Sequence, residues 1–144
     1  MRTLTLLLLA LIAGGPAAAG SLLKVYKSPT CGCCADWVTH MQENGFDTQV
    51  TETENLFPIK TMAQIPAGKG SCHTGFIDGY VIEGHVPADE VARLLKERPE
   101  AIGLTVPGMP VGSPGMEMGD RRDPYEVLLI NNDGSTEVWS RHNQ

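Results

Sequence analysis

The sequence is poor in cysteine and in basic residues, and beyond its N-terminal segment it has no long apolar run. Its 11 lysines and arginines against 17 aspartates and glutamates give a net charge of -6. That balance excludes a general nucleic-acid binder, because neutralising phosphates requires clustered basic side chains. Four cysteines are too few for a disulfide-rich scaffold, and 144 residues suffice for a core without one. No internal repeat is present. We therefore expect a single globular domain.

The N-terminal segment predicts a secretory signal peptide, residues 1–19. Arg2 supplies an early positive charge, residues 4–13 are apolar, and residues 17–19 are alanines that fit an A-x-A cleavage site. The apolar run is too short for a membrane span, which needs about 20 residues. We expect a periplasmic, monomeric mature chain, residues 20–144, with no membrane span. Thiols there oxidise unless a metal or a reductase holds them.

The mature chain alternates strand and helix signals. Strands are predicted at residues 22–27, 46–53, 71–77 and 80–83, and helices at 35–44, 55–62 and from Pro87 to before Pro99. This order predicts an α/β fold of thioredoxin-like type, a mixed sheet flanked by helices. Residues 101–124 are expected to form a Met-bearing loop and residues 125–144 a terminal β-hairpin, which extends the sheet or pins the loop across the domain. Met41 and Met62 are predicted to lie in the core.

Three cysteines crowd the junction of the first strand and the first helix. Cys31, Cys33 and Cys34 form C-x-C and C-x-x-C motifs at once. A helix N-terminus favours thiolate over thiol, which assists both disulfide chemistry and metal binding. A third sulfur invites mispairing in a dithiol catalyst, whereas it suits a soft metal ion. Structural disulfides alone fit poorly, because adjacent cysteines rarely bond to each other.

The predicted fold brings a fourth cysteine to this junction. Cys72 begins the third strand, which in a thioredoxin-like sheet starts beside the end of the first. Pro66 precedes it, where this fold usually carries a cis-proline; the sequence leaves the isomer open. Strand alternation would point His73 to the opposite face, as a supporting group, a separate ligand or neither. His85 is a candidate ligand, a helix cap or a solvent-facing residue. His40 is expected in solvent, His142 near a frayed terminus and Tyr80 in packing.

The methionines favour one metal over others. Four thiolates suit Zn²⁺, iron–sulfur clusters and Cu(I) alike, but thioether sulfur is a ligand for Cu(I) and a poor one for zinc. Met109, Met116 and Met118 lie in a Gly/Pro-rich loop with few other apolar side chains. Packing is the alternative role for them. The pattern therefore favours copper, with zinc the weakest candidate.

Five motifs together resemble the CopG-type periplasmic copper-resistance family. They are residues 31–34 (CGCC), 71–74 (SCHT), 79–87 (GYVIEGHVP), 106–110 (VPGMP) and 112–116 (GSPGM). The resemblance covers nearly all of the mature chain. It implies a thioredoxin-like fold, copper held by the four cysteines in a thiolate-bridged multinuclear cluster or in separate sites, and a role in copper tolerance. Members are thought to interconvert Cu(I) and Cu(II) rather than exchange disulfides.

We therefore hypothesise a periplasmic copper-binding protein that exchanges copper with a chaperone or an efflux system. The expected ligands are four cysteines, with three methionines and two histidines as further candidates: Cys31, Cys33, Cys34, Cys72, Met109, Met116, Met118, His73 and His85. The imidazoles would favour Cu(II) and permit one-electron cycling. Two alternatives stay open, a thiol–disulfide oxidoreductase using Cys31 and Cys34 with Cys72 resolving, and a non-redox copper store or chaperone. The sequence does not decide whether the protein is an enzyme.

Overall fold

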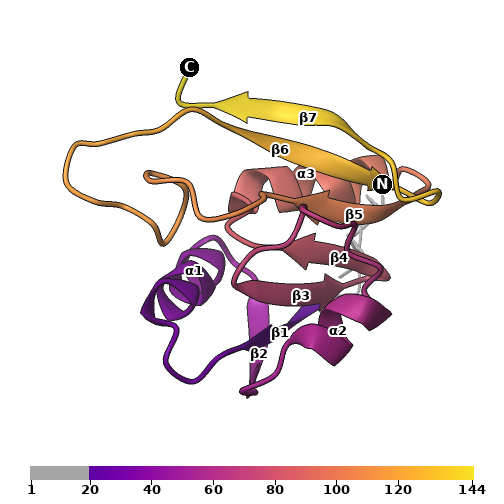
Figure 1. Ribbon diagram of the computed structural model, residues 1–144, viewed down its shortest axis with the longest axis horizontal. Helices are drawn as coiled ribbons and strands as arrows, with labels where there is room; N and C mark the ends of the chain where they lie inside the picture. The colour runs from indigo at the N-terminus through magenta and orange to yellow at the C-terminus, as the bar shows by residue number, and fades with distance from the viewer. Residues whose placement is uncertain (1–19) are drawn as a thin grey trace, which may run out of the picture.

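The computed structural model describes residues 20–144, so the signal-peptide prediction for residues 1–19 lies outside the described part. The elements, in chain order, are β1 (Leu22–Lys27), α1 (Gly32–Glu43), β2 (Asp47–Glu52), α2 (Phe57–Met62), β3 (His73–Ile77), β4 (Tyr80–Glu83), α3 (Ala88–Glu97), β5 (Ala101–Thr105), β6 (Tyr125–Asn131) and β7 (Thr136–His142) (Figure 1). The strands form one seven-stranded sheet in the order β2-β1-β3-β4-β5-β6-β7. β1 pairs parallel with β2, and β4 with β5, whereas the other neighbours are antiparallel. The predicted mixed α/β sheet is confirmed.

Helix α1 starts earlier than its apolar pattern predicted. It begins at Gly32 rather than at residue 35, with Cys31 as the extended N-cap residue. Its buried face, Cys34, Trp37, Val38 and Met41, follows the three- and four-residue spacing of an amphipathic helix. The early start puts Cys33 and Cys34 in the first helical turn.

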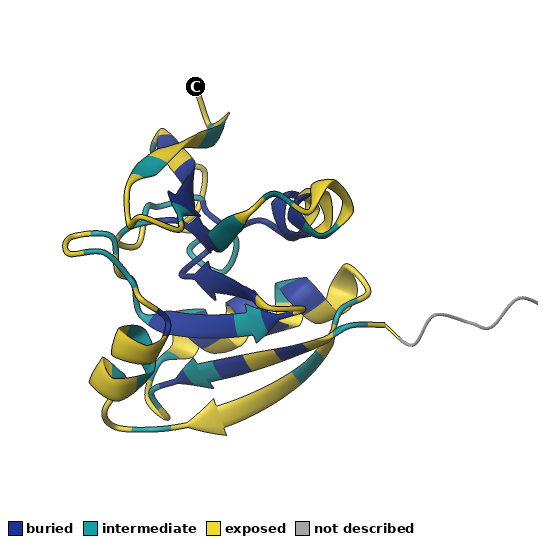
Figure 2. Ribbon diagram, turned by 90° about the vertical axis from the view of Figure 1, so that its right-hand side faces the viewer, coloured by how far each residue is buried: buried dark blue, intermediate teal, exposed yellow. Residues whose placement is uncertain are grey.

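The core lies on one face of the sheet, under α1 and α3. β4 is buried along its whole length and β2 is an exposed edge strand (Figure 2). α2 has no buried residue. Met41 is confirmed in the core, but the prediction for Met62 was wrong, because its side chain is 62% exposed.

The C-terminal part corrects one expectation and confirms another. Residues 101–105 were expected in the loop but form β5, parallel to β4. Gly103 permits this pairing, since a Cβ there would meet the Val81 carbonyl oxygen. β6 and β7 form the expected hairpin and extend the sheet from β5. The Met-bearing loop is therefore shorter, residues 106–124.

His40, expected in solvent, and His142, expected near a frayed terminus, have structural roles instead. His40 Nε2 accepts a hydrogen bond from the Ala88 N–H at 3.1 Å and so caps α3. His142 lies in β7, 3.1 Å from a Glu90 carboxylate oxygen and stacked on Tyr125. Tyr80 packs in the core, as predicted.

Two backbone findings complete the fold. Every peptide bond in the described range is trans, including the one before Pro66. Among residues 20–144, no helix combines the length and apolar composition needed to cross a membrane.

Candidate metal site

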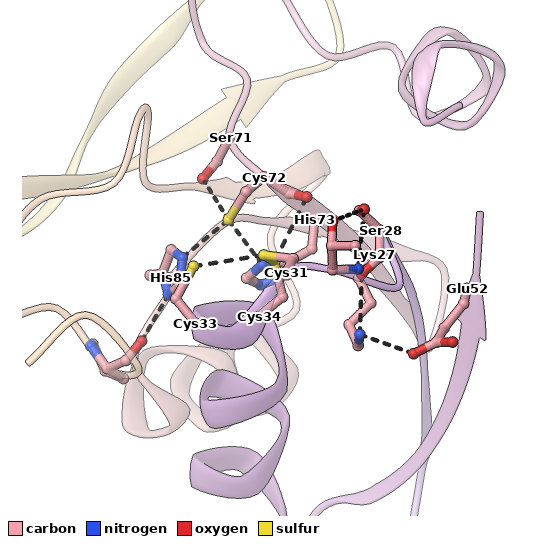
Figure 3. Close-up of a disulfide and its surroundings, with 12 residues drawn as sticks. Lys27, Ser28, Cys31, Cys33, Cys34, Glu52, Ser71, Cys72, His73 and His85 are labelled. Atoms are coloured by element: carbon pink, nitrogen blue, oxygen red, sulfur yellow. Dashed lines mark hydrogen bonds and ion pairs between the residues drawn. A yellow bond between two sulfur atoms is a disulfide. The ribbon is translucent and has the colours of Figure 1, made fainter. Parts of the chain in front are cut away.

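The N-terminus of α1 carries three sulfur atoms, one on the N-cap residue Cys31 and two in the first helical turn, on Cys33 and Cys34. Cys31 and Cys34 form a disulfide with Cα atoms 5.3 Å apart. Cys33 is a free thiol whose Sγ lies 3.5 Å from Cys31 Sγ. This turn follows β1 directly, so the sheet fixes where the sulfurs lie (Figure 3).

The fourth sulfur reaches the same place through sheet pairing. β3 runs antiparallel to β1, with His73 opposite Lys27 at the end of β1 that leads into α1. Cys72, immediately before β3, is therefore delivered to the cysteine turn. The four ligand atoms of Cys31, Cys33, Cys34 and Cys72 all lie within 4.8 Å of one another. The structure thus brings together the four cysteines that the sequence analysis singled out.

Two imidazoles adjoin the fourth sulfur. Cys72 Sγ lies 3.1 Å from His85 Nε2 and 3.5 Å from His73 Nδ1. These three residues form a second potential ligand group within 4.8 Å that shares Cys72 with the first. The expected opposite direction for His73 was wrong, because Cys72 precedes the strand and strand alternation does not apply to it. His85 neither caps α3 nor faces solvent; it is fully buried.

The two imidazoles are oriented differently by their other contacts. His85 Nδ1 lies 2.8 Å from the Pro114 carbonyl oxygen, so it carries the proton and donates, which leaves the Nε2 lone pair directed at Cys72. This is the arrangement that metal-binding histidines commonly show. His73 stacks on Trp37 at 4.3 Å, and its Nε2 has no hydrogen-bond partner within the described residues.

Burial keeps this corner of the site uncharged at neutral pH. Burial, with electrostatic repulsion from His85 when it is protonated and from Lys60, lowers the pKa of His73 to about 3. The pKa of His85 is also lowered by burial. Burial raises the pKa of the Cys72 thiol to about 11. The imidazoles therefore offer lone pairs, and a bound cation would supply the charge that deprotonates Cys72.

The Met-bearing loop packs against the cysteine turn. A Cβ at Gly115 would lie 2.7 Å from the Cys33 carbonyl oxygen and from the Trp37 nitrogen, and its φ is +82°. Only glycine fits this close, left-handed position. The methionine that follows it, Met116, is half-buried, whereas Met109 and Met118 are exposed.

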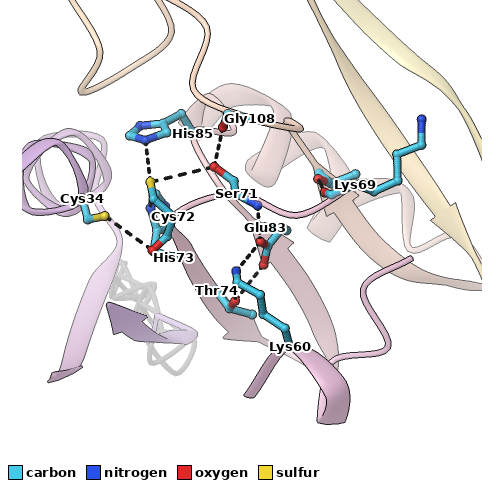
Figure 4. Close-up of polar contacts among 11 residues, drawn as sticks. Cys34, Lys60, Lys69, Ser71, Cys72, His73, Thr74, Glu83, His85 and Gly108 are labelled. Carbon is cyan, nitrogen blue, oxygen red and sulfur yellow. Dashed lines mark hydrogen bonds and ion pairs between the residues drawn. The ribbon is translucent and has the colours of Figure 1, made fainter. Parts of the chain in front are cut away.

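Sequence reasoning missed a polar group beneath Cys72. The Glu83 carboxylate is fully buried in β4 and accepts hydrogen bonds from the Ser71 N–H, from Thr74 Oγ1 and from Lys60 Nζ (Figure 4). The one available signal was an acidic residue closing an otherwise apolar strand.

Two of the three comparisons with known proteins found a match. Residues 69–116 match a family model described as a protein of unknown function, DUF411. No curated protein sequence matches the chain. Two solved structures, named Copper resistance protein copG Form 2 and Form 1, are similar to it over 85% of this chain and 98% of theirs. Form 2 is 42% identical with a TM-score of 0.82, and Form 1 is 43% identical with a TM-score of 0.81.

Proposed function

Because the chain belongs to the CopG family of copper resistance proteins, we propose that it binds copper through Cys31, Cys33, Cys34 and Cys72. The observation that carries the proposal is the convergence of these four sulfurs within 4.8 Å. Two electrons and two protons from an external dithiol reductant, itself oxidised to a disulfide, would convert the Cys31–Cys34 disulfide to thiols and so give four thiols in the site. Thiolate sulfur is a preferred ligand of Cu(I). Thiolates that bridge neighbouring ions would allow a multinuclear cluster.

The strand order supports a thioredoxin-like fold for the first part of the domain. Strands β2-β1-β3-β4 have one parallel pair and two antiparallel pairs, and the C-x-x-C motif begins α1. The β5–β7 segment is the addition to it. We place the protein in the periplasm after cleavage behind Ala19, acting as a monomer that exchanges copper with a chaperone or an efflux system.

The imidazoles extend the proposal to both copper oxidation states. His73 and His85 adjoin Cys72, and nitrogen ligands suit Cu(II), whereas sulfur suits Cu(I). Thioethers of Met109, Met116 and Met118, on the loop packed against α1, are further candidate ligands for Cu(I) or shield it from water. With both donor types in one site, we propose that the protein interconverts Cu(I) and Cu(II), giving one electron to an external acceptor in the oxidation and taking one from an external donor in the reduction.

Metal analysis of protein isolated from the periplasm without added metal tests the copper site. We expect copper in wild-type protein and its loss in Cys31→Ser and Cys72→Ser, with Met62→Ser as an exposed-residue control. Zinc in place of copper, or a metal-free wild type, would contradict the proposal.

The disulfide itself supports a second candidate, a thiol–disulfide oxidoreductase. Cys31 and Cys34 are already paired, and the free Cys72 is close enough to act as a resolving thiol. Cys33→Ser separates the two functions, since it would spare dithiol chemistry but damage a copper site. The double variant His73→Ala/His85→Ala distinguishes a non-redox copper store from a protein that cycles copper between oxidation states. A store needs no imidazole, so copper tolerance would be unchanged in this variant if the protein is a store.

A further inference from the structure

The buried carboxylate of Glu83 lies directly beneath the segment that carries Cys72. Its Oε1 accepts a hydrogen bond from the Ser71 N–H at 2.6 Å, and Ser71 is the residue before Cys72. Its Oε2 accepts one from Thr74 Oγ1 at 2.7 Å. Lys60 of α2 completes the group with an ion pair to Oε1. One side chain in β4 therefore connects α2, β3 and the Cys72 segment.

Stability alone does not account for this arrangement. Removing a carboxylate and an ammonium group from water carries a large desolvation penalty, and well-packed apolar residues often stabilise a core equally well. The Glu83 side chain has no exposed surface, and that of Lys60 is 23% exposed. Unlike an apolar side chain, a buried carboxylate accepts hydrogen bonds in a fixed direction and can therefore hold a backbone segment in place.

The Cys72 segment needs such an anchor because it lies outside the strand. β3 begins at His73, so Ser71 and Cys72 have no ladder hydrogen bonds to hold them. Ser71 is held instead by Glu83 through its N–H and by the Gly108 carbonyl oxygen, which its hydroxyl contacts at 2.5 Å. A Cβ at Gly84 would lie 2.5 Å from the Ser71 side chain, so the segment is confined on that side as well.

We propose that Glu83 is a positioning residue that holds Cys72 at ligand distance from the three cysteines of α1. It touches no metal ion and acts through the Ser71 backbone. This inference rests on the proposed copper site, and it assigns the buried Glu83–Lys60 pair to the geometry of that site.

The test is the Cu(I) affinity of fully reduced protein, measured by competition with a colorimetric Cu(I) chelator. Glu83→Leu/Lys60→Met removes both charges and leaves the Ser71 N–H without an acceptor. The matched variant Glu83→Gln/Lys60→Met also removes both charges but keeps an amide oxygen for Ser71. We expect the first variant to lose about 10–100-fold in affinity, the range for groups that orient metal ligands, and the second to stay within a few-fold of wild type.

A double-mutant cycle separates positioning from general damage. Reduced Cys72→Ser protein keeps three thiols that bind added Cu(I) weakly, and the Leu/Met variant should cause no additional loss of this residual affinity, because the ligand it positions is already gone. Combined with Cys33→Ser, its full loss should remain. Equal losses in the Gln/Met and Leu/Met variants would overturn the inference, as would a full additional loss in the Cys72→Ser background.

A shorter carboxylate keeps the inference testable if the Leu/Met variant does not fold. Glu83→Asp retains the charge for Lys60 but withdraws the oxygen from Ser71 by one methylene. We expect a smaller loss of affinity that disappears when Cys72 is absent; an affinity equal to wild type would refute the proposal. The outcomes also distinguish the two hypotheses. If wild-type protein binds no copper, the proposed function fails; if it binds copper through Cys72 and the Glu83 variants bind equally well, only the positioning role fails.

Discussion

The contact between the Met-bearing loop and α1 is tested most directly by Gly115→Ala. The added Cβ would lie 2.7 Å from the Cys33 carbonyl oxygen and from the Trp37 nitrogen, both backbone atoms of a helix that cannot move aside. A non-glycine residue in the left-handed conformation costs about 1–2 kcal/mol. Forcing extra volume into packed structure adds about 1–3 kcal/mol. We therefore expect about 2–5 kcal/mol of destabilisation.

Gly119→Ala is the matched control for this substitution. Gly119 is in the same loop and also has a positive φ, +56°, but a Cβ there would meet no atom within 4 Å. It should cost only the conformational part, about 1–2 kcal/mol. Since 1 kcal/mol corresponds to about 4 °C for a domain of this size, thermal unfolding should place Gly115→Ala about 4–12 °C below Gly119→Ala. Equal melting temperatures would show that the loop does not pack on α1.

Three further predictions concern stability away from the site. Burial raises the pKa of Tyr125 to about 12, so the neutral phenol stabilises the fold fully below pH 10, and this stabilisation is lost as the pH rises from 10 to 12. In urea unfolding across this pH range, the free energy of unfolding should fall more steeply for wild type than for Tyr125→Phe, and identical slopes would refute the prediction. In the same assay, Met41→Ala should lower the free energy of unfolding by about 2–5 kcal/mol and Met62→Ala by less than about 0.5 kcal/mol, because of the two only Met41 is buried. Similar losses in the two variants would contradict the burial pattern. His40→Ala removes the acceptor for the Ala88 N–H, so the free energy of unfolding should fall by about 0.5–2 kcal/mol, and the helical content measured by circular dichroism should fall with it. An unchanged free energy of unfolding would exclude the capping role.

Local signals predicted most of the sheet. A short, mostly apolar run predicted the strand at residues 22–27, and the turn-forming pair Asp78-Gly79 lies between the strands predicted at 71–77 and 80–83, which pair as the β3–β4 hairpin. β5 was missed because Ala101, Ile102 and Gly103 lack a strand pattern. They form a strand because the edge of β4 is open to pairing and Gly103 permits the close approach to Val81, which is information from a distant part of the chain.

The four cysteines could be predicted as one group, but their surroundings could not. The C-x-C and C-x-x-C spacing and the fold order were sufficient to bring Cys72 to the α1 cysteines. The direction of the His73 side chain relative to Cys72 depends on the residue at which β3 begins. The boundary of a strand is the feature that a sequence pattern predicts least reliably. The burial of Glu83 beneath Cys72 depended on a partner, Lys60, supplied by a helix with no buried residue of its own.

The separation of the two cysteine segments has a consequence for the unfolded chain. Cys34 and Cys72 are 38 residues apart, and β2 and α2, the least buried elements, lie between them. An ion bound by both segments would close a loop around these two elements and restrict the conformations open to the chain before it folds. An ion that binds the folded site more tightly than it binds the unfolded chain stabilises the fold by mass action. With the proposed copper as that ion, protection of the β2 and α2 amides from hydrogen exchange would increase with metal loading.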